Sequence, residues 1–236
     1  MGWWSAVGSA ISGVCSCIGN AISSAFSGVC SALGHIGRTA IDLVIKPPSL
    51  DIFKVIVKAV GWLAEKLGLK EPEEKPEELG DRAIQAQEKG IKPENYNSTR
   101  EYIQDIREKT TFDQKKFDKL SPQEKLERES LGTSIYTKGV EEEMKMELPS
   151  EFLVDIGKLN LTGPQMEQLI AAFKKQGFDS MQPMSQYLRG NLAGDKVSKA
   201  GTAMKEAAAV QNPGLSRDEI NAKILKAQET IRNTQI

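Results

Sequence analysis

The chain has no charged residue in its first 37 positions, where Asp, Glu, Lys and Arg are all absent. The complete chain has 236 residues and a formal net charge of −1, so its charge lies further along, most densely between Lys70 and Glu147. A helix that faces water normally carries charge on its exposed side. The missing charge therefore predicts that residues 1–37 work in an apolar environment.

Histidine is scarce too, since His35 is the single histidine of the sequence. Asp42 is the one carboxylate within ten residues of His35 in the sequence. A serine or cysteine nucleophile needs an adjacent base, and this chain offers little to build one. The sequence also lacks a glycine-rich phosphate loop, an HExxH motif and an acidic calcium loop. We therefore expect no enzymatic activity and no cofactor, although a hydrolase that uses two carboxylates alone stays open.

Cysteine is scarce, with three residues at positions 15, 17 and 30. Together with His35 they imitate the spacing of a zinc site. Cys15 and Cys30 occupy equivalent positions of an internal repeat, however, and Ala32 takes the place of Cys17 in the second copy. We interpret them as small helix residues and expect no metal. The balanced charge favours no nucleic-acid partner, and no basic region precedes the apolar stretch as in a secretory signal.

The repeat is the strongest signal in the sequence. Residues 9–19, SAISGVCSCIG, return as residues 24–34, SAFSGVCSALG, with eight of eleven positions identical. The large apolar residues of this region recur every three or four positions, which places them along one side of a helix. We predict that this stripe faces lipid; its members are Trp4, Val7, Ile11, Val14, Ile18, Ile22, Phe26, Val29, Leu33 and Ile36.

Small residues fill the rest of the helix circumference, which allows two backbones to approach closely, as in membrane helix pairs. The glycines expected to mediate this packing are Gly8, Gly13, Gly19, Gly28, Gly34 and Gly37. The six large apolar side chains between Trp4 and Ser23 supply about −3 kcal/mol of insertion free energy. Insertion of one isolated helix is therefore marginal, and we expect the segment to enter a membrane only under certain conditions. A single long helix and a hairpin that folds back at Gly19-Asn20 both stay open, as does burial in a soluble assembly.

A second helix is predicted over Asp51–Leu69, after Pro47-Pro48. Lys54 and Lys58 share one narrow polar sector, and Trp62 lies among the apolar residues. This pattern is typical of a helix that lies in the lipid headgroup layer. A core helix of the soluble part explains it equally well.

No stretch alternates with period two, so we predict an all-α chain: long apolar or amphipathic N-terminal helices, a bundle of short helices and an extended helical C-terminus. The expected parts are membrane-active helices at 1–69, a Pro-rich charged linker at 70–78, a soluble domain at 79–189 and a helical tail at 190–236. Helix starts are expected at Ser98, Ser121, Ser150, Thr162 and Ser216. Gly132 and Gly139 weaken the helix that follows Ser121, and an Ala- and Lys-rich segment is expected over Met184–Ala209.

The layout resembles the small pore-forming effectors of bacterial type VI secretion, which combine a glycine-zipper-like apolar segment with an α-helical soluble part. The six glycines above carry the resemblance, and the stretch from Pro93 to Leu169 is similar to such a soluble part. The resemblance implies delivery into a rival cell, depolarisation of its inner membrane and an immunity protein in the producer.

We therefore predict a pore- or ion-channel-forming protein that leaves a bacterial cytoplasm without a Sec signal and oligomerises in a target membrane. A secretion carrier or chaperone is a further expected partner. Two alternatives stay open. One is an internal bacteriophage virion protein, located in the phage particle and ejected ahead of the genome, and the other is a non-enzymatic helical adaptor.

Overall fold

The computed structural model describes residues 24–45 and 49–233. The stripe residues Trp4, Val7, Ile11, Val14, Ile18 and Ile22 and the glycines Gly8, Gly13 and Gly19 lie outside these described residues. The described part is helical, which confirms the all-α fold class, and its β-type pairing is limited to one isolated bridge between Glu147 and Ser180.

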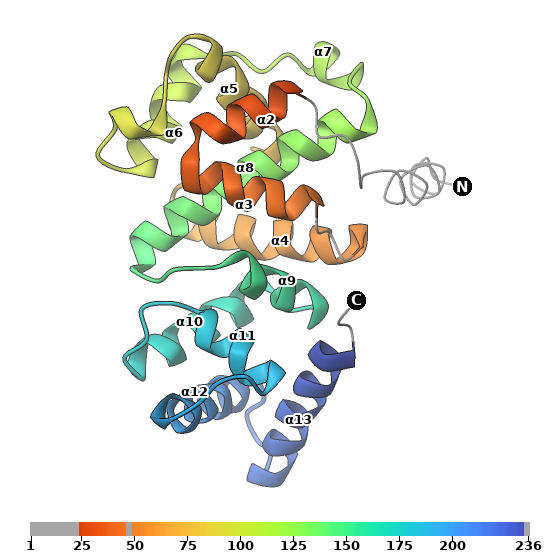
Figure 1. The fold of residues 1–236 in the computed structure, drawn as a ribbon, viewed down its shortest axis with the longest axis vertical. Helices are drawn as coiled ribbons and strands as arrows, with labels where there is room; N and C mark the ends of the chain where they lie inside the picture. Colours follow the sequence, from red (N-terminus) through yellow and green to blue (C-terminus); the bar gives the residue numbers. More distant parts are fainter. Residues whose placement is uncertain (1–23, 46–48, 234–236) are drawn as a thin grey trace.

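The helices are arranged in two layers along the long axis of the molecule (Figure 1). The upper layer holds α2 to α8 and the lower layer holds α9 to α13. The elements are α2 (Ser24–Ala32), α3 (Gly34–Ile45), α4 (Leu50–Lys66), α5 (Pro76–Glu88), the 3-10 turn η2 (Pro93–Asn95), α6 (Thr99–Lys109), α7 (Gln114–Asp118), α8 (Pro122–Met144), α9 (Ser150–Lys158), α10 (Gly163–Lys175), α11 (Gln182–Arg189), α12 (Asp195–Gln211) and α13 (Arg217–Asn233).

Side-chain caps start several helices where the sequence predicts them. The Ser98 hydroxyl accepts from the Glu101 amide at the start of α6, and Ser121 and Glu124 form a reciprocal capping box on α8. At α10 the Gln165 side chain accepts from the Thr162 amide at 2.9 Å. These caps satisfy amide groups that the first helical turn leaves without partners, which is why local sequence can specify them.

Helix α8 is the central element of the upper layer and packs against α3, α4, α5 and α6. It runs unbroken through Gly132 and Gly139 to Met144, so these glycines do not end the helix. A Cβ atom built on Gly132 would lie 1.8 Å from the Pro76 carbonyl oxygen, and one on Gly139 would lie 2.8 Å from Leu69 Cδ1. Both glycines provide space for a neighbouring segment, and that packing offsets their low helix propensity.

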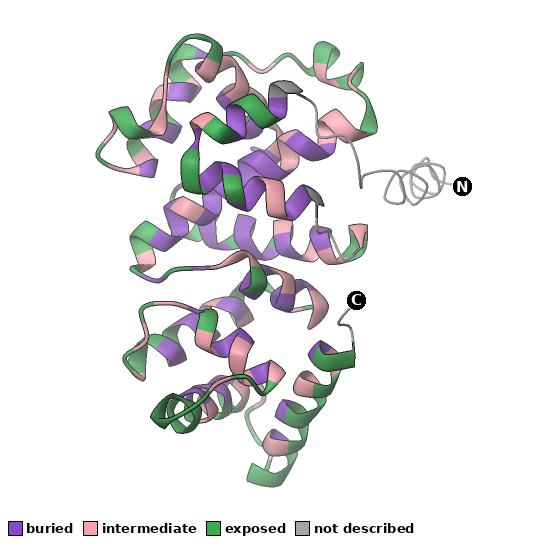
Figure 2. Ribbon diagram, in the orientation of Figure 1, coloured by how far each residue is buried: buried purple, intermediate pink, exposed green. Residues whose placement is uncertain are grey.

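The predicted linker, residues 70–78, lies against the upper layer. Glu74 is buried, and its carboxylate accepts from Arg107 Nε at 3.0 Å and from the Tyr136 hydroxyl at 2.5 Å. Arg107 also donates to the Leu69 carbonyl at 2.8 Å. Because α4 packs on α8, α9 and α10, the helices before and after this stretch contribute to one continuous core (Figure 2).

The predicted tail is part of the folded body. Helix α12 packs on α10 and α11, and α13 packs on α11 and α12. The buried residues that anchor the two helices are Ala200, Ala203, Met204, Ala207, Ile220, Ile224 and Ile231. The Ala- and Lys-rich segment expected over Met184–Ala209 is divided between α11 and α12, because Gly190 and Gly194 adopt positive φ angles of 79° and 72°.

Candidate functional site

The second copy of the repeat forms α2 and the turn at Gly34, and with α3, which follows it, makes a helical hairpin on the face of the upper layer (Figure 1). Gly34 makes the turn between the two helices with φ of +56°. A Cβ atom on Gly37 would lie 1.8 Å from the Cys30 carbonyl oxygen, so glycine at 37 lets α3 pack directly against the end of α2. Gly34 and Gly37 therefore shape the hairpin itself.

The described residues of the stripe lie on the buried side of the hairpin, two of them on α2, Leu33 at the turn and Ile36 on α3. The turn at Gly34 excludes one continuous helix through this part of the stripe. Phe26, Val29, Leu33 and Ile36 are all buried, and they join the core formed with α8 and the helices around it. In the conformation described, these four side chains contact protein. A lipid-facing role for them requires the hairpin to leave the body.

The opposite face of α2 is exposed and consists of small, uncharged residues. Ser27, Gly28 and Ser31 are exposed, and a Cβ atom built on Gly28 would have no neighbouring atom within 4 Å. The Ser31 hydroxyl donates to the Ser27 carbonyl at 2.9 Å, which satisfies it within the helix. The surface of α2 thus presents Ser and Gly where a typical surface helix would present charge.

Polar contacts join the hairpin to the body at two points. The Ser150 hydroxyl donates to Asp42 Oδ2 at 3.0 Å, and His35 Nε2 lies 3.9 Å from Glu141 Oε2. Burial raises the pKa of Glu141, while the Leu148 amide, which donates to it at 2.8 Å, acts in the opposite direction. Because the His35 side chain is 49% exposed, its contact with Glu141 lies at the edge of the interface.

Cys30 has the properties of a packing residue. It is buried, and desolvation raises the pKa of its thiol to about 12, with the charge of Glu127 as a smaller cause. A thiol with that pKa stays protonated at neutral pH and is a poor nucleophile or metal ligand. Within residues 24–45 and 49–233, no three His, Cys, Asp or Glu side chains are arranged to hold a metal ion.

The helix predicted for the membrane interface is α4, and in this structure it is a core helix. Lys54 and Lys58 are exposed on its polar sector, while Phe53, Ile56 and Leu63 are buried. Trp62 is 37% exposed and lies against Gly163 of α10, where a Cβ atom would come within 2.6 Å of it. Of the two alternatives left by the sequence, the described structure has the core helix.

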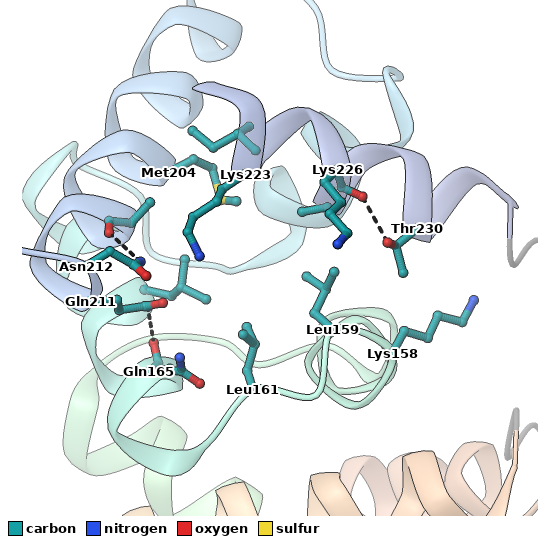
Figure 3. Close-up of a pocket in the computed structure, with 14 residues that line it drawn as sticks. Lys158, Leu159, Leu161, Gln165, Met204, Gln211, Asn212, Lys223, Lys226 and Thr230 are labelled. Carbon is teal, nitrogen blue, oxygen red and sulfur yellow. Dashed lines mark hydrogen bonds between the residues drawn. The ribbon is translucent and has the colours of Figure 1, made fainter. Parts of the chain in front are cut away.

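A pocket in the lower layer was not predicted from the sequence (Figure 3). It has a volume of about 330 Å³ and lies between the α9–α10 connection, α10, α12 and α13. Leu159, Leu161 and Met204 line it together with Lys223 and Lys226. Its lining comes from residues up to 72 positions apart in the sequence. The sequence signal was limited to the small residues of α12 and α13, which leave room between the helices.

Comparison with protein-family models, with curated proteins and with solved structures finds no match for this chain. Among the helices of the described ranges, none has both the length and the apolar character that crossing a bilayer requires.

Proposed function

We propose that this chain is a membrane-permeabilising protein, a secreted antibacterial effector that forms an ion-conducting pore. The observation that carries the proposal is the charge-free run of residues 1–37 with its eleven-residue repeat. In the second copy the bulky residues lie on one side of α2 and the Ser and Gly residues on the other. In an oligomer, bulky side chains can face hydrocarbon while small ones let helices pack closely.

The docked hairpin fits a state of the protein before insertion. Six bulky side chains of the hairpin are buried, the four of the stripe together with Leu43 and Val44, and keeping each from water is worth about 1.5–3 kcal/mol. Undocking into water would lose that free energy, about 9–18 kcal/mol in total. Undocking into a bilayer keeps the same side chains in an apolar medium, so a membrane can compete with the body for this hairpin.

Insertion also requires polar groups of the hairpin to change partners. The contacts of Asp42 with Ser150 and of His35 with Glu141 lie between the hairpin and the body, and each is partly accessible to water. An exposed or half-exposed contact of this kind contributes at most about 1 kcal/mol. The expected partners are a lipid bilayer, further copies of this chain, a secretion carrier or chaperone and an immunity protein.

Substitution of Gly28 by Leu tests the packing step without disturbing the docked fold. The position is exposed and has space for a side chain, so Gly28→Leu should keep the thermal unfolding temperature of the protein. The larger side chain should block close packing between copies. We expect wild-type protein to release dye from anionic liposomes and to give stepped currents in planar bilayers, and Gly28→Leu to lose those currents.

Ala209→Leu is the matched control, because Ala209 is an exposed small residue on α12 and the substitution adds the same apolar bulk elsewhere. This variant should keep full activity. Intact liposomes with wild-type protein would refute the pore. Periplasmic expression separates the alternatives: a toxin arrests growth and depolarises the cell, whereas a virion component or an adaptor is tolerated.

A further inference from the structure

The pocket of the lower layer has an apolar interior. Leu159 and Leu161 come from the α9–α10 connection, and Leu169, Met204 and Ile224 from α10, α12 and α13. Ala208 and Ala227 face it from α12 and α13, where larger side chains would fill the space. A volume of about 330 Å³ falls at the lower end of the range for small-molecule sites.

Positive charge lies at the rim of this pocket. Lys158, Lys223 and Lys226 belong to its lining, and no Asp or Glu does. In Figure 3 the side chains of Lys223 and Lys226 extend from α13 toward Leu159 and Leu161, while Lys158 extends away from the centre. Residues 150–233, which form the lower layer, carry eleven Lys and Arg against nine Asp and Glu, so the surroundings add a small net positive charge.

We propose that this pocket binds a single acyl chain with an anionic head, as in a fatty acid or a lysophospholipid. The chain would lie on Leu159, Leu161 and Leu169, and the head would contact the ammonium groups of Lys223 and Lys226. An apolar interior beside two lysines matches that chemistry in both shape and charge.

Charge and size favour this occupant over three others. The charge-free segment of this chain would leave both lysines without a counter-ion, and a neutral lipid would do the same. A two-chain phospholipid needs more volume than the pocket provides. The site is built from α9, α10, α12 and α13, so the inference is independent of the proposed function of the N-terminal region.

Calorimetric titration of the full chain with monomeric sodium dodecanoate tests the proposal, with dodecanol and hexanoate as comparison ligands. We expect saturable binding of one dodecanoate and binding at least about tenfold weaker for both comparison ligands, since each lacks either the charge or the chain length. Equal binding of dodecanol would overturn the role of the lysines. Absence of dodecanoate binding would overturn the site.

Two variants locate the binding. Lys223→Gln with Lys226→Gln should weaken dodecanoate binding about tenfold, because it removes the charged donors. The control Lys196→Gln with Lys205→Gln removes the same charge from exposed positions of α12 outside the pocket, and it should bind as wild type does. If both double variants lose affinity equally, the binding reflects net charge and the assigned site is incorrect.

Ala227→Leu fills the pocket while leaving the lysines in place, and it should abolish dodecanoate binding with unchanged circular dichroism. Retained binding in Ala227→Leu would place the ligand elsewhere. These readouts use no bilayer, so a failure here is distinct from a failure of liposome leakage. If the protein binds dodecanoate but leaves vesicles intact, the binding site is supported and the proposed pore is refuted.

Discussion

Gly132 of α8 meets the main chain of α5 so closely that a Cβ atom on it would lie 1.8 Å from the Pro76 carbonyl oxygen. One turn further along α5 the relationship is reciprocal, because a Cβ atom on Gly80 would lie 1.9 Å from the Arg128 carbonyl oxygen. The two helices therefore cross at backbone-to-backbone distance. This crossing fixes α5, and with it the segment 70–75 that precedes it, on the central helix.

We expect Gly132→Ala to destabilise the protein by about 3 kcal/mol or more, since the added methyl group must push two backbones apart. The measurement is urea unfolding followed by circular dichroism. Gly28→Ala is the control on α2, where the new methyl group meets no atom within 4 Å. It should stabilise the protein by up to about 1 kcal/mol through helix propensity. A neutral Gly132→Ala would contradict the close crossing.

The buried carboxylate of Glu74 depends on two partners from different helices. Arg107→Gln should cost about 3–5 kcal/mol of unfolding free energy, because the change leaves a buried charge without its cation. Tyr136→Phe removes a neutral donor to the same carboxylate and should cost about 1–3 kcal/mol. Both values are measured by chemical denaturation at pH 7.

Lys175→Gln is the control for Arg107→Gln. It breaks the exposed pair with Glu206 and should cost at most about 1 kcal/mol. Equal effects at Arg107 and Lys175 would mean that Glu74 does not hold the segment 70–78 on the upper layer.

Glu129 of α8 should make stability fall as pH rises. Desolvation raises the pKa of its carboxyl to about 7, with the charge of Glu77 as a further cause and Lys54 acting against it. Because the folded state holds this proton more tightly than the unfolded state, the destabilisation begins above the ordinary pKa of 4.5 and is complete above about 7. Glu129→Gln should therefore gain about 2–3 kcal/mol over wild type at pH 8 and much less at pH 5.

Glu124, one turn earlier on α8, provides the opposite case. Hydrogen bonds from the Ser121 hydroxyl and the Ser121 amide lower the pKa of Glu124. Its ionised form therefore stabilises the protein above the ordinary pKa, and that contribution is lost as pH falls. Glu124→Gln should lower stability at pH 8. If Glu129→Gln and Glu124→Gln shift the unfolding midpoint at pH 8 in the same direction, the burial of Glu129 is not the cause of the pH dependence.

Local chemistry made the helix starts predictable, and long-range packing made other features unpredictable. Ser98, Ser121 and Thr162 cap the helices that they precede, because a cap needs residues within one turn. The packing role of Gly132 depends on Pro76, which is 56 positions away, so a helix-propensity argument could not reveal it.

The same limit applies to the candidate sites. Helical periodicity predicted that Phe26, Val29 and Leu33 share one face, but it carries no information on whether that face meets lipid or protein. The pocket requires α9, α12 and α13 to come together, so Lys223 and Lys226 had no local pattern that distinguished them from solvated lysines.

Release of the α2–α3 hairpin should control the rate of membrane permeabilisation, and Ser150 offers a mild way to change it. Its hydroxyl donates to Asp42 of α3 across the interface, and Ser150→Ala removes that bond. A hydrogen bond of this kind contributes about 1 kcal/mol net, which corresponds to about a fivefold larger undocked population.

We expect Ser150→Ala to show faster amide exchange in residues 24–45 and about fivefold faster dye release from liposomes. Thr202→Ala, which removes a hydroxyl bonded within exposed α12, should change neither. Faster exchange without faster release would mean that the docked hairpin does not limit insertion.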